Sequence, residues 1–161
     1  MIQKKSSIEN AIVTGASGFI GKALVKSLVN KGVEVTAVDI NPCSQEICKS
    51  VVRDVTTSNA LNDYINEDTV IFHLAAKASV QNSVINPAED FHNTCYGIFQ
   101  VLETARKFGS RLIFPSTASI FDAGIKLPVT EKSYVRPSSP YGAAKVAGEA
   151  YCYVYNRCYG L

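Results

Sequence analysis

The sequence lacks the features that mark several large classes of protein. It has no tryptophan, one methionine and a net charge of only +2 from 16 basic and 14 acidic side chains. So small a charge argues against the strong field with which nucleic-acid and membrane-surface binders attract their partners. No apolar run reaches the roughly 18 residues of a membrane-spanning helix, and no signal-type apolar segment follows the basic N-terminus. We therefore expect a soluble, cytoplasmic protein with no nucleic-acid and no membrane partner.

The cysteines also argue against two kinds of site. They number five, which is odd, and contain no CxxC pair, and neither His73 nor His92 lies near one at a ligand spacing. We predict free thiols, mostly packed in the core, and no metal site. With 161 residues the chain can bury a core, and its length predicts one domain.

What the sequence does have is a glycine-rich turn between an apolar run and an amphipathic segment. Ile12 and Val13 predict the end of a buried strand, and residues 19–30 predict a helix. Three glycines spaced three apart lie between or just inside them: Gly15, Gly18 and Gly21. Such glycines permit positive φ and close approach to a ligand, and the free N–H groups of a helix start suit a pyrophosphate. Alone, the pattern fits an ordinary tight turn equally well.

An aspartate downstream agrees with the nucleotide interpretation. Gly32 predicts the end of the helix, and alternating apolar residues predict a second strand over residues 33–41. Asp39 stands near the end of this strand, about twenty residues beyond the turn, where dinucleotide-binding folds place an acid for the ribose hydroxyls. A carboxylate there would repel a 2′-phosphate, so the sequence favours NAD over NADP. A solvated aspartate at a strand end is the alternative.

Three further strands are predicted over residues 50–55, 69–76 and 111–117. The middle one is apolar almost throughout, as a central parallel strand should be. Its His73 is predicted to be a core histidine rather than a catalyst. The last one runs into a cluster of hydroxyl side chains, which would lie on the ligand side of a parallel sheet.

Asp54 and Val55 end the third predicted strand. In an open parallel sheet this position would let Asp54 accept a hydrogen bond from an adenine amino group while Val55 covers the ring. An equally good interpretation makes Asp54 the cap of a helical segment over residues 56–64.

Pro87 precedes a predicted helix over residues 89–108. Its apolar stripe contains Phe91, Ile98, Phe99 and Leu102. Asn93 and Gly97 also lie inside it, although both are poor helix formers. A buried asparagine needs hydrogen-bond partners, so Asn93 is expected to hold neighbouring loop backbone in place.

The last predicted helix begins with Ser139 as N-cap and Pro140 as its first residue, and ends at Gly160. Tyr141 and Lys145 are four residues apart and share one face. To act as a base near neutrality, the tyrosine needs its pKa lowered from about 10 to about 7. A lysine ammonium, the positive end of the helix and an oxidised nicotinamide would each lower it. A surface tyrosine and lysine on an amphipathic helix are the alternative.

Together these segments resemble a known family. TGASGFIG, Asp39, Asp54 with Val55, HLAA, Asn93, STAS and YGAAK occur in the order and approximate spacing of the extended short-chain dehydrogenase/reductases. The chain is most similar to their NAD-dependent nucleotide-sugar epimerase/dehydratase family, and the resemblance covers nearly all of it. The expected fold is a doubly wound α/β parallel sheet (Rossmann) with strand order 3-2-1-4-5.

The resemblance implies a set of cofactor contacts. The pyrophosphate would rest on Gly15, Ser17, Gly18, Phe19, Ile20 and Gly21. The adenosine would meet Asp39 with Ile40 or Asn41 at its ribose, and Asp54 with Val55 at its adenine. The nicotinamide half would be bordered by Leu74, Ala75, Ala76 and Lys77, with Asn93 supporting the site and with Tyr141 and Lys145 beside it.

The resemblance also implies catalytic roles. Tyr141 resembles the family's base, Lys145 its partner on the nicotinamide ribose, and Thr117 the hydroxyl that hydrogen-bonds the reacting sugar oxygen. Family dehydratases usually carry acidic residues where this chain has Ala118 and Ser119. We therefore expect a UDP-hexose or UDP-uronic acid 4-epimerase that works by transient oxidation and hydride return. The alternatives are a nucleotide-sugar dehydratase or reductase, and an isolated NAD-binding module.

Members of this family continue beyond the helix that carries the tyrosine, whereas this sequence ends at Leu161. We therefore expect residues 1–161 to be an NAD-binding domain that is incomplete at its C-terminus and lacks the substrate domain. By resemblance we also expect a homodimer formed through the helices that bear Asn93 and Tyr141.

Overall fold

The structure, a computed structural model, describes residues 8–43, 47–121 and 124–161. Within them lies a parallel sheet of five strands in the order β3-β2-β1-β4-β5. The strands are β1 (Asn10–Thr14), β2 (Glu34–Asp39), β3 (Lys49–Val52), β4 (Thr69–His73) and β5 (Arg111–Ile113). Thr14 at the end of β1 pairs with Val38 on one side and His73 on the other. The predicted doubly wound fold and its strand order are confirmed.

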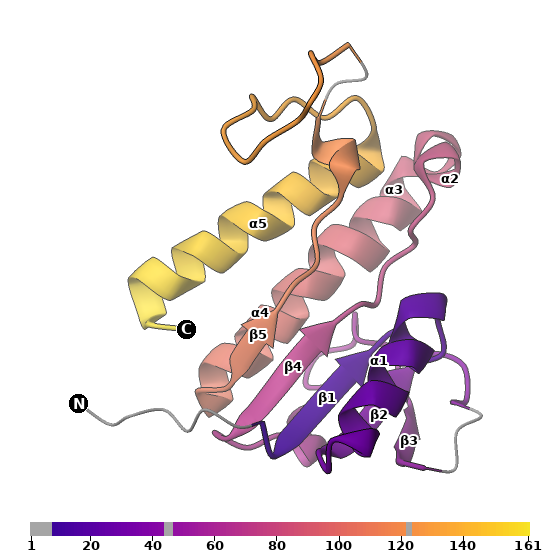
Figure 1. Cartoon of the computed structure of the whole chain (residues 1–161), viewed down its shortest axis with the longest axis vertical. Coiled ribbons are helices and arrows are strands. Elements are labelled where there is room, and N and C mark those ends of the chain that lie inside the picture. The colour runs from indigo at the N-terminus through magenta and orange to yellow at the C-terminus, as the bar shows by residue number, and fades with distance from the viewer. Residues whose placement is uncertain (1–7, 44–46, 122–123) are drawn as a thin grey trace.

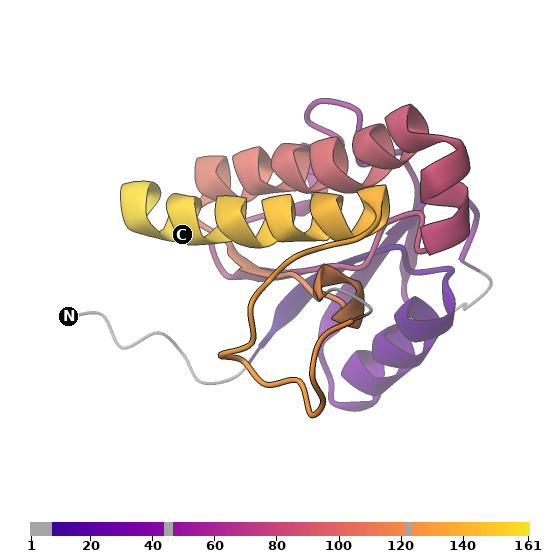
Figure 2. The same ribbon diagram turned by 90° about the horizontal axis from the view of Figure 1, so that it is seen from above.

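Helices cover both faces of the sheet (Figures 1 and 2). On one face lies α1 (Phe19–Asn30), whose bounds are those predicted. On the other face α4 (Gly97–Phe108) and α5 (Pro140–Tyr159) lie side by side, as Figure 2 shows from above. The sheet is therefore the middle layer of three, and the loops that leave the ends of its strands share one edge.

Two cores result from the alternation of side chains along β1. Ala11 and Val13 point to the α1 face, where they pack with Val25 in one buried cluster. Ile12 points to the opposite face and packs with Val101 of α4 in a second cluster. Successive side chains of a strand face opposite sides, so a central strand covered on both sides is apolar along its whole length.

The helix predicted over residues 89–108 is longer and is interrupted. It begins as α3 (Pro87–Asp90), continues as a π-helical turn, η2 (Phe91–Tyr96), and ends as α4. A short helix that was not predicted, α2 (Val80–Ile85), precedes it and is capped by Ser79. A π-helical turn within an α-helix often marks a functional site.

The π-helical turn explains one wrong prediction. Phe91 was expected on the buried stripe with Ile98 and Leu102, but it is 60% exposed while the other two are fully buried. A π-turn inserts an extra residue, so positions before Gly97 are rotated relative to those after it. Asn93 lies inside the same π-helical turn.

Four predicted strands are shorter in the structure: β2 ends at Asp39, β3 at Val52, β4 at His73 and β5 at Ile113. The predicted helix over residues 56–64 is also mostly turns, with only η1 (Asn62–Tyr64) in helical form. After each of these strands the chain leaves the sheet earlier than predicted and continues as a loop at the C-terminal edge of the sheet. These loops form the site described below.

Helix α5 has the predicted ends. The hydroxyl of Ser139 accepts a hydrogen bond from the Gly142 amide, and Gly160 closes the helix with a φ of 73°. Among the described residues between β5 and α5, one short 3-10 turn forms, η3 (Ala118–Ile120). No helix in residues 8–43, 47–121 and 124–161 has both the length and the apolar composition that a bilayer crossing requires.

Candidate functional site

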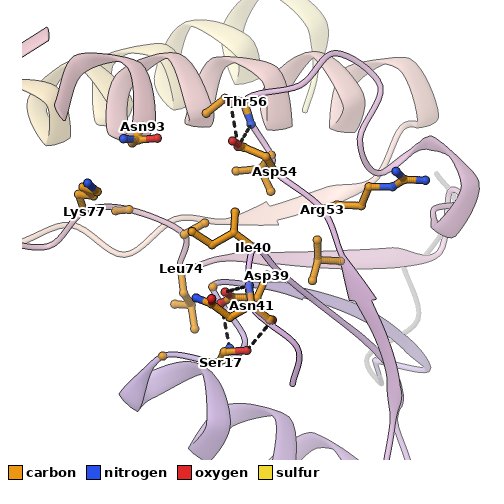
Figure 3. Close-up of a pocket in the computed structure, with 16 residues that line it drawn as sticks. Ser17, Asp39, Ile40, Asn41, Arg53, Asp54, Thr56, Leu74, Lys77 and Asn93 are labelled. Atoms are coloured by element: carbon orange, nitrogen blue, oxygen red, sulfur yellow. Dashed lines mark hydrogen bonds between the residues drawn. The ribbon is translucent and has the colours of Figure 1, made fainter. Parts of the chain in front are cut away.

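A cavity of about 340 Å³ opens at the C-terminal edge of the sheet, where the loops after β1, β2, β3 and β4 meet (Figure 3). Most of the predicted cofactor-binding residues line it: Gly15, Ser17, Gly18, Asp39, Ile40, Asn41, Asp54, Val55, Leu74, Ala75, Ala76, Lys77 and Asn93. Residues from five separate parts of the chain thus surround one space. Ligands of open α/β sheets bind at this edge.

The glycine turn packs as closely as the sequence predicts. Gly15 has a φ of +67°, and a Cβ atom there would lie 2.7 Å from the amide nitrogen of Ala75. A Cβ atom on Gly21 would lie 2.2 Å from the carbonyl oxygen of Gly15. A side chain at either position would collide with backbone. Gly15 therefore lets the turn lie against the loop after β4, and Gly21 lets α1 begin directly against the turn.

The start of α1 is open to a ligand. Its N-cap is Gly18, which supplies no side-chain hydrogen bond, and its first turn contains no acidic residue. Phe19 is almost fully exposed and Ile20 largely exposed, whereas Gly21 is buried. The side chains of Phe19 and Ile20 do not line the cavity, and neither does Gly21. The start of α1 therefore presents backbone N–H groups rather than side chains, at the positive end of the helix dipole.

Asp39 ties the turn to the end of β2. Its carboxylate accepts hydrogen bonds from the Ser17 amide at 3.0 Å and from the Asn41 amide at 2.9 Å. The Ser17 hydroxyl donates to the carbonyl oxygen of Asn41 at 3.0 Å. Figure 3 shows the three side chains together at one end of the cavity. The half-buried carboxylate is therefore held in place at the position where the sequence predicts a ribose contact.

Asp54 lies at the edge of the cavity and also caps a turn, although not the helix predicted over residues 56–64. One carboxylate oxygen accepts hydrogen bonds from the amide and the hydroxyl of Thr56, at 2.9 and 2.8 Å, and so caps the turn that follows. The same residue lines the cavity, and Val55 beside it is buried. Thr56 and Arg53 also line the cavity and were missed in the sequence. Arg53 extends away from Asp39 in Figure 3.

The far end of the cavity is bordered by the loop after β4. Leu74, Ala75 and Ala76 line it with small or apolar side chains, which leave the backbone accessible. Lys77 forms an ion pair with Glu89 of α3, and both side chains are about half exposed. Asn93 faces the same space from the π-helical turn (Figure 3). The π-helical turn thus contributes one polar side chain to the cavity.

The three predicted catalytic residues lie close to one another but do not line the cavity itself. The Lys145 ammonium nitrogen lies 5.9 Å from the centre of the Tyr141 ring and 4.4 Å from that of Phe114. It donates a hydrogen bond to the carbonyl oxygen of Pro115 at 3.0 Å, just beyond β5. The Thr117 hydroxyl lies close enough to Tyr141 to lower the pKa of the phenol. Strand β5 and helix α5 therefore bring together residues up to 28 positions apart in the sequence.

The acidities differ from one sequence prediction. Burial raises the pKa of Tyr141, and the charge of Asp90 raises it further, while the hydrogen bond to Thr117 lowers it. The predicted lowering of this pKa is therefore wrong for the protein alone, because burial disfavours the phenolate. Burial lowers the pKa of Lys145 to about 8, against the opposing effect of Asp90. Lys145 is thus mostly an ammonium ion at pH 7.

His73 is the predicted core histidine. It is 1% exposed, and its Nδ1 lies 2.8 Å from the Thr14 hydroxyl. Burial, aided by the charge of Lys145, lowers the pKa of His73 to about 3, so the ring is neutral. Its ring stacks on that of Phe114. His73 therefore lies between Thr14, at the end of β1, and Phe114, whose ring lies below the Lys145 ammonium.

Asp90 is a buried acid that the sequence analysis did not single out. It lies in α3 and is only 3% exposed. In the sequence it follows Glu89 shortly after Pro87, which is where an ordinary solvated acid in a first helical turn would stand. Its burial depends on helix packing, which no local pattern reveals.

Comparison with known proteins agrees with this geometry. The model of the NAD dependent epimerase/dehydratase family matches residues 11–161. UDP-glucose 4-epimerase of Mycolicibacterium smegmatis is 34% identical over 165 residues, and dTDP-glucose 4,6-dehydratase of Mycobacterium tuberculosis is 29% identical over 164. Each match covers 93% of this chain. The crystal structure of Thermus thermophilus UDP-glucose 4-epimerase complexed with NAD matches 94% of the chain with a TM-score of 0.83 and 31% identity.

These matches cover 52% of the Mycolicibacterium epimerase, 50% of the dehydratase and 52% of the Thermus chain. The chain therefore spans about half the length of the curated relatives that it matches. The range matched by the family model, residues 11–161, contains the glycine turn, strands β2 to β5 and the three residues Thr117, Tyr141 and Lys145. The chain belongs to the NAD dependent epimerase/dehydratase family.

Proposed function

We propose that this chain binds NAD in the cavity at the C-terminal edge of its sheet. The observation that carries the proposal is the joint placement of the glycine turn, the uncapped start of α1 and the Asp39 carboxylate around one space. Gly15 and Gly21 leave backbone where a Cβ atom would collide, which suits a close-fitting diphosphate. Asp39 would hold the adenosine ribose, and its charge favours NAD over the phosphorylated NADP.

We further propose nucleotide-sugar 4-epimerase chemistry, on a UDP-hexose or a UDP-uronic acid. Bound NAD would supply a hydride acceptor, which in its reduced form would return the hydride. The Tyr141 oxygen would take the proton of the sugar hydroxyl and later return it, and the Thr117 hydroxyl would hydrogen-bond the same sugar oxygen. Because burial raises the pKa of Tyr141, the phenolate needs a nearby cation, which the Lys145 ammonium provides.

The residues after Thr117 favour epimerisation over dehydration. Elimination of water needs an acid and a base in addition to the groups that accept and return a proton. At the two following positions this chain has Ala118 and Ser119, of which the first has no polar side chain and the second a hydroxyl. The relatives include both epimerases and dehydratases, so this difference is what supports the choice.

Calorimetric titration with NAD tests the binding proposal on the chain itself. We expect Asp39→Ala to weaken NAD binding about tenfold or more, because the ribose hydroxyls lose a charged acceptor. Asp68→Ala is the matched control, since it removes an exposed aspartate that does not line the cavity. Equal affinities of the wild-type chain and Asp39→Ala would overturn the assignment of Asp39.

An assay with UDP-glucose separates the enzyme from an isolated NAD-binding module. Hydride transfer requires the sugar to be positioned within about one ångström. Because the chain spans only about half the length of its relatives, we expect little or no turnover by these residues alone. In a longer form that does turn over UDP-sugars, Tyr141→Phe should abolish epimerisation while NAD binding persists. Full turnover by the Tyr141→Phe form would contradict the proposed base.

We also propose a homodimer formed through the helices that bear Asn93 and Tyr141. Apolar and aromatic side chains are exposed on both, including Phe91 and, on α5, Tyr151 and Val154. Contiguous exposed apolar surface favours association. Sedimentation velocity at micromolar concentration should show twice the mass of the chain, and a monomer across the concentration range would overturn this proposal.

A further inference from the structure

Behind the proposed catalytic residues lies a buried carboxylate that neither the sequence motifs nor the proposed mechanism uses. Asp90 is 3% exposed and Lys145 is 4% exposed. The two residues belong to elements that pack together, since both α3 and the adjoining π-helical turn contact α5. A buried acid and a buried lysine therefore share the interior between these helices.

The carboxylate is poorly satisfied by hydrogen bonds. One oxygen accepts from the Thr94 hydroxyl at the long distance of 3.5 Å. The other oxygen is buried and finds no hydrogen-bond partner among the residues that the structure describes. An ionised carboxylate removed from water is strongly destabilising unless a charge or hydrogen bonds compensate it. The Thr94 hydrogen bond favours the ionised form, but at this length it compensates for burial only in part, and a nearby positive charge adds to it.

Lys145 supplies that charge. Burial raises the pKa of Asp90, whereas the hydrogen bond from Thr94 and then the Lys145 ammonium lower it. Burial in turn lowers the pKa of Lys145, and Asp90 raises it. The other titratable groups that sense this pair are Tyr141 and Cys95, which sense Asp90, and His73, which senses Lys145 from β4. Among these five groups only Lys145 carries a positive charge at neutral pH, because burial keeps His73 neutral.

We propose that Asp90 is a positioning residue of the site: its carboxylate is the buried counter-charge that holds the Lys145 side chain as an ammonium ion beside Tyr141. The role assigned to that ammonium rests on the proposed function, whereas the charge coupling is a property of the protein alone. Without Asp90, the lysine would lose its proton closer to neutral pH. The cation that the Tyr141 phenolate requires would then be present in fewer molecules.

Titration of Lys145 by carbon-13 NMR tests this coupling without cofactor or substrate. The chain would be labelled at the lysine Cε atoms, and the Lys145 signal would be assigned as the one missing in Lys145→Arg. We expect Asp90→Asn to move the midpoint of the Lys145 titration to lower pH by about one pH unit, a tenfold change in proton affinity. Asp90→Glu keeps the charge and should restore most of this difference.

Glu89→Gln is the matched control. It removes the same charge from the neighbouring position, but Glu89 is about half exposed and pairs with Lys77 rather than with Lys145. We expect this variant to leave the Lys145 midpoint unchanged. An unchanged midpoint in Asp90→Asn, or an equal movement in Glu89→Gln, would overturn the proposal, because Lys145 would then be indifferent to the carboxylate.

The reciprocal experiment keeps the proposal testable if Asp90→Asn does not fold. Coupling between two sites is mutual, so removing the lysine must affect the acid by the same free energy. In Lys145→Gln, we expect the Asp90 carboxyl carbon to titrate at higher pH than in the wild-type chain. An unchanged Asp90 titration would overturn the proposal as firmly as the first result.

The test can fail independently of the proposed function. If the Lys145 midpoint moves but calorimetry shows no NAD binding, the counter-charge is established and the cofactor assignment is wrong. If NAD binds but the midpoint does not move, the cofactor assignment stands and Asp90 has no influence on the lysine. Both measurements require a folded chain, but one reports the titration of Lys145 and the other the binding of NAD.

Discussion

Two regions meet at the candidate site, and they are held in place by different means. The glycine-turn region comprises β1, the turn, α1 and β2, and its parts are joined by backbone contacts and by the Asp39 carboxylate. The hydroxyl region comprises Thr117, η3 and the first turns of α5. Its parts come from separate stretches of chain and are joined by few bonds, such as that from Lys145 to Pro115. The first region should therefore be rigid and intolerant of added atoms, and the second more adjustable.

Gly21→Ala should give the largest effect, because it adds an atom to the rigid region. The new Cβ atom would lie 2.2 Å from the Gly15 carbonyl oxygen and within 2.9 Å of the Ala16 backbone. Neither neighbour can move without displacing β1 or the turn. We expect the free energy of unfolding to fall by about 3 kcal/mol or more, measured by urea denaturation.

Gly97→Ala is the control for this prediction. Gly97 is also helical, but the nearest atoms to a Cβ there are side-chain carbons at 3.8 and 3.9 Å, which is ordinary contact. Alanine should therefore leave stability unchanged or raise it by up to about 1 kcal/mol. Equal losses in the two variants would show that the glycine turn is no more tightly packed than a typical helix.

His73 lies between the two regions, because it contacts Thr14 of the first and senses Lys145 of the second. Its pKa of about 3 in the folded protein is below the ordinary value of 6.5, so the unfolded chain binds a proton that the folded chain refuses. Stability should then be lost as pH falls from about 6.5 toward 3, by a few kcal/mol. In His73→Gln this part of the loss should disappear, as measured by urea denaturation at a series of pH values.

The comparison for that experiment is His92→Gln. His92 is exposed and stacks on Tyr96 at the surface of the π-helical turn. Because the buried ring of His73 is intact in His92→Gln, the loss of stability assigned to His73 should persist in that variant. If His73→Gln retained the full loss below pH 6.5, the buried ring would not be the source of acid sensitivity.

Gly142→Ala tests the adjustable region in the same way that Gly21→Ala tests the rigid one. A Cβ atom on Gly142 would also lie 2.2 Å from a carbonyl oxygen, here that of Ser119 in η3. Because η3 lies in a connecting segment rather than in the sheet, it can move away. We expect a smaller loss, about 1 to 2 kcal/mol by urea denaturation, with a folded chain that still binds NAD. A loss as large as that of Gly21→Ala would remove the distinction between the two regions.

The same distinction explains how far the sequence could be interpreted. The bounds of α1 and the position of Asp39 follow from short local patterns, and the strand order follows from the family resemblance; each is found in the structure. These features depend on neighbours within a few residues or on rules common to all parallel sheets. The sequence does not reveal the cavity itself, but most of the residues predicted to contact the cofactor line it.

What could not be predicted depends on packing between distant segments. The π-helical turn that exposes Phe91 has no local signal, because its residues are compatible with an ordinary helix. The direction of the Tyr141 pKa depends on how deeply α5 buries the ring, and the burial of Asp90 depends on how α3 packs on α5. Desolvation decides both, and desolvation is a property of the folded protein.

Ser139→Ala should give the smallest effect. The Ser139 hydroxyl caps α5 by accepting from the Gly142 amide at 3.1 Å, two residues before Tyr141 in the sequence. Loss of this cap should lower the free energy of unfolding by about 1 kcal/mol, measured by urea denaturation. Ser79→Ala, which removes the cap of the short α2, is the matched control for stability. If the hydroxyl region is adjustable, only Ser139→Ala should also increase amide hydrogen exchange in the first turn of α5. No increase there would mean that helix packing, rather than its cap, holds Tyr141 in position.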